Sequence, residues 1–236
     1  MKFQWFGVSH FLITTDAGVR IATDPFQYNI IVDQKPKDAN IIRPTYSGEA
    51  DVVTISHSHG DHSYIWAIQG VPLVYTGGAP EEFKGVKFSS VASYHGMYLG
   101  LNNIIIIEAD DLRICHVGDH GHVLNDKQIE EIGRVDILMT NWDDDPMEMT
   151  FEVLDVVLNQ LKPKVVFPMH HVIVNEFMTG RKGFVDLTVD NVTEVEFTAE
   201  SLPSEMQVVL FKPSLGNPVN YCDEEQPGGI YEPKNL

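Results

Sequence analysis

The chain has 236 residues, of which 43% are hydrophobic and 21% charged, and this composition is typical of one large domain, here residues 1–236, with a sizeable core. Its 34 acidic and 16 basic residues give a net charge of −18, which disfavours nucleic acid as a partner because phosphates require a basic surface. No apolar run approaches the ~20 residues of a membrane span, and two cysteines make no disulfide framework, so we expect a cytoplasmic protein without membrane association.

The N-terminal part of the chain alternates strand-like runs with turns. Four runs are predicted strands, namely residues 2–8, 11–15, 19–23 and 51–56. Residues 26–50 show no such pattern, and a loop of this length is predicted to form either a rim beside a pocket or plain surface cover. Residues 63–69 are expected to open a helix.

The rest of the chain reads as further strands with two helices among them. A hairpin is predicted with arms 103–109 and 112–118, and other strands are expected at 86–93, 135–140, 164–169 and 208–212. Cap residues and apolar spacing predict helices over 125–132, followed by Gly133, and over 150–161. The tail 223–236 is rich in Pro, Gly and charge, so we expect it to be loose or docked on a partner.

The most informative segment is HSHGDHS, residues 57–63, which directly follows one of the predicted strands. In an extended loop, positions i and i+2 point the same way, so His57 and His59 can hold one ion while Asp61 and His62 turn toward a second. Imidazole with carboxylate suits Zn, Mn or Fe(II). The alternative is a chance histidine cluster that caps a helix.

More ligand-type side chains follow other predicted strands, since His95, Asp119 and His170 each stand just beyond one. Ligands at the carboxyl ends of several strands predict a site along one edge of a layered α/β fold. Alternation along the strand turns His116 away from Asp119, so we expect a hydrogen-bonded core or supporting residue. Cys115 is expected to be a small core residue.

The segments WFGVSHFLI, TDP, HSHGDH, SYH, RICHVGD and PMH together resemble the metallo-β-lactamase superfamily, and within it the small metal-dependent hydrolases related to ascorbate-phosphate lactonase. The resemblance covers residues 1–171 and implies an α/β (α+β) fold, a four-layered αββα sandwich with a dinuclear site on one edge. It implies that a first metal is held by His57, His59 and His95, a second by Asp61, His62 and His170, and that Asp119 bridges the two. The PMH motif selects His170 over His171.

The expected activity is hydrolysis of a small ester, lactone or phosphoester by a hydroxide that bridges two divalent ions, with zinc preferred and manganese or iron open. Asp61 is expected to orient this hydroxide as well as to bind metal. His122 is the candidate proton donor, with His120 behind it, and a loop histidine without a catalytic role is the alternative. Asp24 and Asp51 are candidates to orient the metal-binding imidazoles.

Two other functions compete with hydrolysis. One is a non-catalytic metal-binding or regulatory protein on the same fold. The other is a redox di-iron protein, which ranks lower because such members usually carry Glu where this chain has His59. The family resemblance also makes a homo-oligomer an expectation, whereas the roles of His10 and of the acidic run 141–146 stay open.

Overall fold

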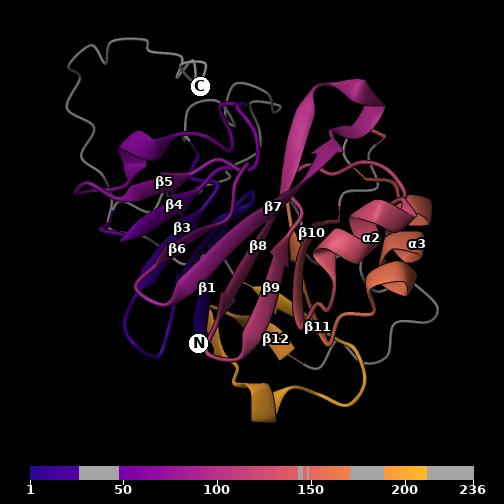
Figure 1. Cartoon of the computed structure of the whole chain (residues 1–236). Helices are drawn as coiled ribbons and strands as arrows, with labels where there is room; N and C mark the ends of the chain where they lie inside the picture. Colours follow the sequence, from indigo (N-terminus) through magenta and orange to yellow (C-terminus); the bar gives the residue numbers. More distant parts are fainter. Residues whose placement is uncertain (27–47, 143–145, 148, 171–188, 212–236) are drawn as a thin grey trace, which may run out of the picture.

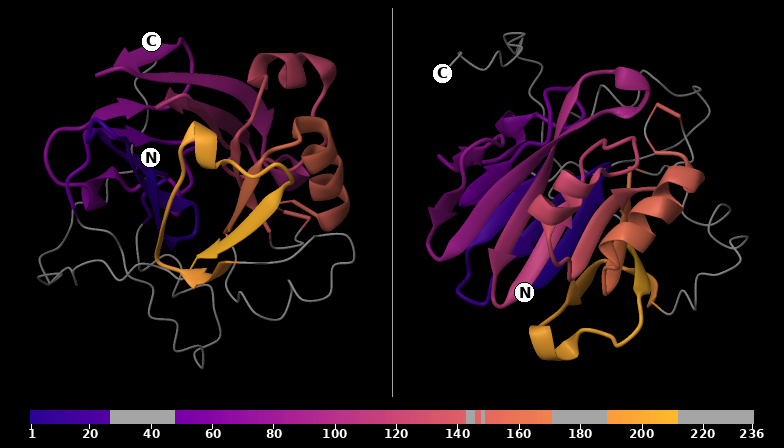
Figure 2. Two further views of the ribbon diagram at one scale, coloured as in Figure 1. Left: turned by 90° about the horizontal axis from the view of Figure 1, so that it is seen from below. Right: turned by 45° about the vertical axis from the view of Figure 1, so that its right-hand side comes forward.

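The structure, a computed structural model, describes residues 1–26, 48–142, 146–147, 149–170 and 189–211. These residues form two β-sheets that face one another, with α-helices on the outer side of one sheet (Figure 1). Figure 2 shows the same layers from two other directions, and in its right-hand view the helices lie in front of the sheet that they cover. The expected α/β sandwich is confirmed, and both of the described α-helices cover the same sheet.

The first sheet has six strands in the order β13-β1-β2-β3-β4-β5. Their bounds are β1 (Lys2–Gly7), β2 (His10–Thr14), β3 (Arg20–Thr23), β4 (Val52–Thr54), β5 (Leu73–Tyr75) and β13 (Glu194–Glu196). The strands β1 to β3 are antiparallel neighbours, whereas β3, β4 and β5 run parallel. The four strands expected in this region are confirmed, three of them one to three residues shorter and β2 beginning one residue earlier, while β5 was not expected.

The second sheet has eight strands in the order β12-β14-β11-β10-β9-β8-β7-β6. Their bounds are β6 (Glu81–Phe83), β7 (Val86–Tyr94), β8 (Leu101–Ala109), β9 (Leu112–His116), β10 (Ile137–Asn141), β11 (Val165–Met169), β12 (Val189–Val192) and β14 (Gln207–Phe211). The predicted hairpin joins β8 to β9 through Asp110 and Asp111, whose φ angles of 50° and 60° are those of a type I′ turn. Beyond β9 the sheet is parallel through β10, β11 and β14.

The helices α2 (Asp126–Ile132) and α3 (Phe151–Leu161) confirm the two predicted helices. Asn125 and Gln128 form a capping box at the start of α2, and Thr150 accepts a hydrogen bond from the Val153 N–H at the start of α3. No helix among the described residues has both the length and the apolar character needed to cross a membrane.

The helix predicted over residues 63–69 is wrong, because only the 3-10 turn Ile65–Ala67 forms there. Tertiary partners take the backbone donors on either side of that turn: Tyr64 donates to Pro25 O and Gln69 to Gly48 O. Most of the segment 26–50 and the whole tail 223–236 lie outside the described residues. The expectation of a single domain stays a prediction.

The core lies between the two sheets, and within its mainly aliphatic packing it contains a cluster of aromatic side chains. Phe167 of β11 packs against Phe3 of β1 and Phe11 of β2, with ring centroids 5.2 and 6.0 Å away. Phe211 of β14 completes this cluster, 4.9 Å from Phe167. The inner faces of the sheets are therefore fixed against one another, which sets the position of the loops that follow their strands.

Candidate metal centre

Side chains of ligand type gather at one edge of the sandwich because several strands run in the same direction there. β7 and β9 are both antiparallel to β8, so both point the same way, as do β10 and β11. His95 follows β7, Asp119 follows β9 and His170 follows β11. β4 of the facing sheet leads into the HSHGDHS segment.

The first ligand group consists of His57, His59, His95 and Asp119, and one ligand atom of each lies within 4.8 Å of the others. His95 Nε2 is 3.1 Å and His57 Nε2 is 3.4 Å from Asp119 Oδ2. The His59 ring lies 4.4 Å from that of His57 and 5.0 Å from that of His95, measured between centroids. This group matches the residues expected at a first metal.

The second ligand group consists of Asp61, His62 and His170, again within 4.8 Å of one another. His170 Nε2 is 3.7 Å from Asp61 Oδ2 and 3.8 Å from Asp119 Oδ1. His62 Nε2 is 3.0 Å from Asp119 Oδ2. The structure thus brings all seven predicted ligand residues together, with Asp119 between the two groups, while His171 lies outside the described residues.

Asp24, at the end of β3, contacts this centre from behind. Its Oδ2 lies 2.8 Å from His62 Nδ1, which leaves His62 Nε2 on the side of Asp119. Ser56 donates its backbone N–H to Asp24 Oδ1 at 2.7 Å and its hydroxyl to Asp24 Oδ2 at 2.5 Å. Asp24 therefore orients the His62 ring, as expected of it.

The expectation that Asp51 also orients a metal-binding imidazole is wrong. This carboxylate accepts hydrogen bonds from the Arg20 backbone N–H at 2.9 Å and from Lys84 Nζ at 3.0 Å. Asp51 precedes β4, whereas the metal-ligand motif follows it, so the strand itself separates the side chain from the ligand groups.

Two asparagines that sequence reasoning did not assign hold Asp119 in place. Asn102 Oδ1 accepts the Asp119 backbone N–H at 3.1 Å, and Asn141 Nδ2 donates to Asp119 Oδ1 at 3.2 Å. Asn141 ends β10 and so follows the same rule as the ligands, but it was read as part of an acidic run. Asn102 lies near the start of β8 and carries no signal of its own in the sequence.

The electrostatics of the centre fit a cation. Burial alone would raise the pKa of Asp119, but the imidazoles of His62 and His170 outweigh it and hold this pKa well below its usual range. Burial alone would lower the pKa of His62, but Asp119 and Asp24 outweigh it and hold this pKa well above its usual range. A proton on His62 thus balances two buried carboxylates, a balance that a metal ion can also supply.

The pKa of His57 is shifted in the opposite direction to that of His62. Burial, aided by the neighbouring His62, lowers the pKa of His57 to about 3, so its ring is neutral near pH 7. A neutral imidazole offers a lone pair, which is the form that binds a metal ion. With its Nε2 turned to Asp119 and buried, His57 fits the role of a ligand.

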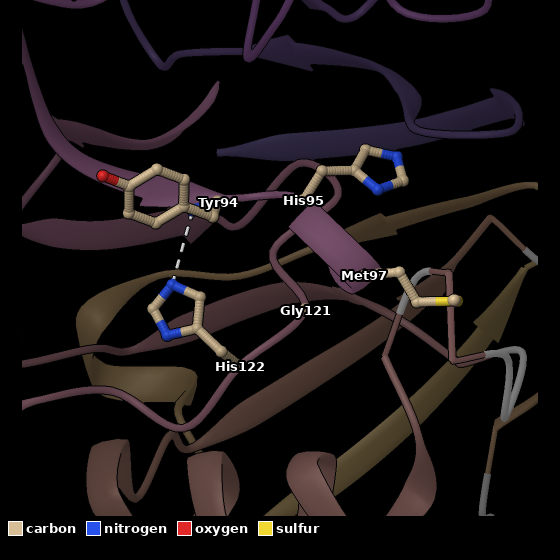
Figure 3. A pocket seen from close by; sticks show the side chains of 5 residues that line it. All are labelled: Tyr94, His95, Met97, Gly121 and His122. Carbon is tan, nitrogen blue, oxygen red and sulfur yellow. Dashed lines mark hydrogen bonds between the residues drawn. The ribbon is translucent and has the colours of Figure 1, made fainter. Parts of the chain in front are cut away.

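His122 lies outside both ligand groups, on the loop after Asp119 (Figure 3). Its Nε2 accepts the Tyr94 backbone N–H at 3.3 Å, and its Nδ1 lies 2.9 Å from Val123 O. The expected proton-donor role stays a prediction, and donation requires one of these contacts to open. The His120 ring lies 4.2 Å from that of His122 and is buried, which lowers the pKa of His120 to about 3.

The other polar residues of the motifs lie in the core. His116 is buried with its Nε2 3.0 Å from Ser9 O, as expected of a hydrogen-bonded core residue. Cys115 is a buried free thiol, as expected. His10 is also buried, and its Nδ1 contacts the backbone oxygen of Thr23, which is the residue before Asp24.

Comparison with known proteins shows which family this chain belongs to. Residues 2–170 match the sequence model of the family described as "Beta-lactamase superfamily domain". A metal-dependent hydrolase of Staphylococcus carnosus is 28% identical over 207 residues, covering 72% of this chain and 85% of that protein. Another, of Methanobrevibacter smithii, is 24% identical over 259 residues, covering 94% of this chain and 100% of that protein.

Among solved structures, a candidate Zn-dependent hydrolase of the metallo-β-lactamase superfamily from Thermotoga maritima is similar, with a TM-score of 0.67 and 28% identity. The match covers 89% of this chain and 97% of that one. The segment matched by the family model ends at His170 and so contains every residue of the two ligand groups. The chain belongs to the β-lactamase superfamily.

Proposed function

We propose that this protein hydrolyses a small ester, lactone or phosphoester with two divalent metal ions held by the two ligand groups. The protein is a metal-dependent hydrolase of the metallo-β-lactamase fold. The proposal adds the number of ions, the residues that hold them and the size of the substrate. The observation that carries it is the pair of adjoining ligand groups, in which the buried carboxylate of Asp119 belongs to the first and contacts the second.

The donor set supports this reading. The two groups contain five imidazoles and two carboxylates, a mixture that suits zinc best and also accepts manganese or iron. When bound, two such ions lower the pKa of a shared water far enough to supply hydroxide at neutral pH and polarise the electrophile. No separate Ser or Cys nucleophile is needed, and Cys115 is buried away from solvent.

The residues of the chain have distinct tasks in this proposal. Asp119, a member of the first group, also contacts the second. Its Oδ2 faces His57 and His95 of the first group and His62 of the second, and its Oδ1 lies 3.8 Å from His170 Nε2. Asp61 is ionised, since the contacts of its carboxylate with His170 and His62 outweigh burial and lower its pKa. An ionised carboxylate accepts a hydrogen bond, so Asp61 can orient the attacking water as well as bind metal.

The substrate is proposed to be a small molecule and not nucleic acid. The net charge of −18 repels long polyanions, whereas two cations make the site itself locally positive. A cytoplasmic location goes with the proposal, since two cysteines, one of them the buried free thiol Cys115, need no oxidising compartment.

The test is elemental analysis of protein purified without added metal, combined with hydrolysis of lactone, ester and phosphodiester probes. We expect about two equivalents of metal, turnover of at least one probe, loss of turnover on chelation and its return when zinc or manganese is restored. One equivalent or none, with no turnover after reconstitution, would replace the proposal with the binding or regulatory protein. Two equivalents of iron with a visible absorption band and no hydrolysis would favour the redox protein.

A further inference from the structure

A cavity of about 330 Å³ lies beside the metal centre. It is lined by Tyr94, His95, Met97, Gly121 and His122 (Figure 3). His95 belongs both to this lining and to the first ligand group, so the cavity adjoins the place where the proposed reaction occurs. A volume near 300 Å³ is at the small end of ligand pockets and holds a ring or a short branched chain.

The walls of the cavity are tied together by two backbone–backbone hydrogen bonds and one from the backbone to a side chain. The Gly121 N–H donates to Tyr94 O at 3.1 Å, and the Tyr94 N–H donates to His122 Nε2 at 3.3 Å. The His95 N–H donates to Gly100 O at 3.1 Å, which closes the turn between β7 and β8. The cavity is therefore held by its own loops without a ligand, as small-molecule sites usually are.

The lining is uncharged apart from its imidazoles, in a chain that carries 34 acidic residues. The lining residues are a tyrosine, a methionine, a glycine and two histidines, with neither a carboxylate nor a lysine or arginine. The tyrosine and the methionine of this lining offer contact to an apolar group, and no charged side chain of the lining is present to pair with a charged one. A methionine adapts to such groups because its side chain is flexible and polarizable.

Two large side chains stand exposed at the rim of this cavity. Met97 is 65% and Tyr94 is 51% exposed, although methionine is usually a core residue. Met97 also has a φ of 49°, a left-handed conformation that is uncommon outside glycine and is kept only where the surroundings impose it. This turn therefore places the Met97 side chain at the cavity and in contact with solvent instead of in the core.

We propose that the cavity binds an uncharged, apolar group of the substrate, about the size of a phenyl ring, next to the bond that is hydrolysed. The inference rests on the proposed function and narrows its substrate class to esters or lactones with an aryl or similar apolar substituent.

A kinetic test compares methyl acetate with benzyl acetate and methyl phenylacetate, which carry a phenyl ring on either side of the ester bond. We expect at least one aryl ester to exceed methyl acetate in kcat/KM by ~10-fold or more. Met97→Asp should bring the ratio close to one. Leu101→Ala is the matched control, because Leu101 is 73% exposed near the same turn but does not line the cavity. Equal ratios in wild type and Met97→Asp overturn the proposal.

A binding test separates this proposal from the proposed function. Ligand-observed NMR of benzyl alcohol with the metal-loaded protein needs no turnover, and we expect binding to wild type and to Leu101→Ala but not to Met97→Asp. If this pattern appears while no ester is hydrolysed, the proposed function fails and the apolar site stands. Absence of benzyl alcohol binding to wild type overturns the site. The site is also overturned if Met97→Asp loses binding only because two copies of the chain separate, which sedimentation of wild type and variant would reveal.

Discussion

Asp119 is the residue on which both ligand groups depend. Asp119→Asn keeps the volume of the side chain but removes the charge that faces His57, His62 and His95. Loss of a direct ligand should exceed the 10–100-fold effect of losing a supporting contact, so we expect hydrolysis to fall more than ~100-fold, with less bound metal. Elemental analysis and initial rates measure both effects.

The control for this variant is Asp111→Asn, which changes an exposed aspartate in the hairpin turn. It should keep its metal and its activity. Circular dichroism of Asp119→Asn should show a folded protein, because the inner core of the sandwich does not include this side chain. Full activity in Asp119→Asn would contradict the dinuclear site.

At the same scale, the ligand residues could be predicted from the sequence and their supports only in part. The ligands can be recognised because the H-x-H-x-D-H pattern, His95, Asp119 and His170 all follow apolar strands. Asn102 and Asn141 do not, because an amide that holds a carboxylate has the same appearance in a sequence as an amide on a surface. Asp24 follows β3, whereas Asp51 precedes β4. Because the two strands run in the same direction, only Asp24 lies at the edge where the ligands gather.

At the scale of elements, the turn after β9 decides where Asp119 lies. Gly118 has a φ of +58°, and a Cβ at this position would stand 2.3 Å from Asn102 Oδ1 and 2.5 Å from Ser56 Cβ. Gly118→Ala should therefore shift this turn and with it Asp119. We expect a loss of about 2 kcal/mol or more in the free energy of unfolding and weaker metal binding, measured by denaturant titration and by competition with a chelator.

Gly85→Ala provides the comparison for Gly118→Ala. Gly85 also has a positive φ, +83°, but nothing lies within 4 Å of its would-be Cβ. It stands at the start of β7, whereas His95 follows the end of that strand. This variant should lose only about 1 kcal/mol from backbone strain and keep its metal affinity. Similar metal affinity in both variants would mean that the turn does not position Asp119.

Elements with a clear local pattern were predictable, whereas some of the shortest strands were not. The hairpin of β8 and β9 and the capped helices α2 and α3 follow from local alternation and capping residues. The strands β5 and β6 have three residues each, which is too short for a pattern, and they form by pairing with β4 and β7. Residues 63–69 failed as a helix because their backbone groups pair with distant segments.

At the scale of the whole molecule, buried histidines make stability depend on pH. His10 is packed against Phe6 and Phe26 and faces Thr23 O, Asp24 and His116. Burial is the largest influence, and it lowers the pKa of His10 from 6.5 to about 4 despite the opposing effect of the Thr23 carbonyl. The folded protein therefore keeps this ring neutral over a range in which the unfolded chain protonates it.

The sign follows from proton binding. Between pH 6.5 and about 4 the unfolded state holds a proton on His10 that the folded state lacks, so acid favours unfolding. One such group contributes up to about 1.4 kcal/mol per pH unit in that window and nothing further once both states are protonated. His10→Gln, measured with chelator present so that metal release does not intervene, should reduce the pH slope of the unfolding free energy by up to that amount.

A second variant separates the proton from the packing. Phe6→Leu removes part of the ring that lies 5.6 Å from His10, between centroids, without removing a titratable group. It should lower stability at every pH and leave the slope between pH 6.5 and 4 as in wild type. If His10→Gln instead lowers stability equally at every pH, then His10 acts only through its contacts, and the acid sensitivity of the fold must come from other groups, among them the buried His120 and His57 of the metal centre.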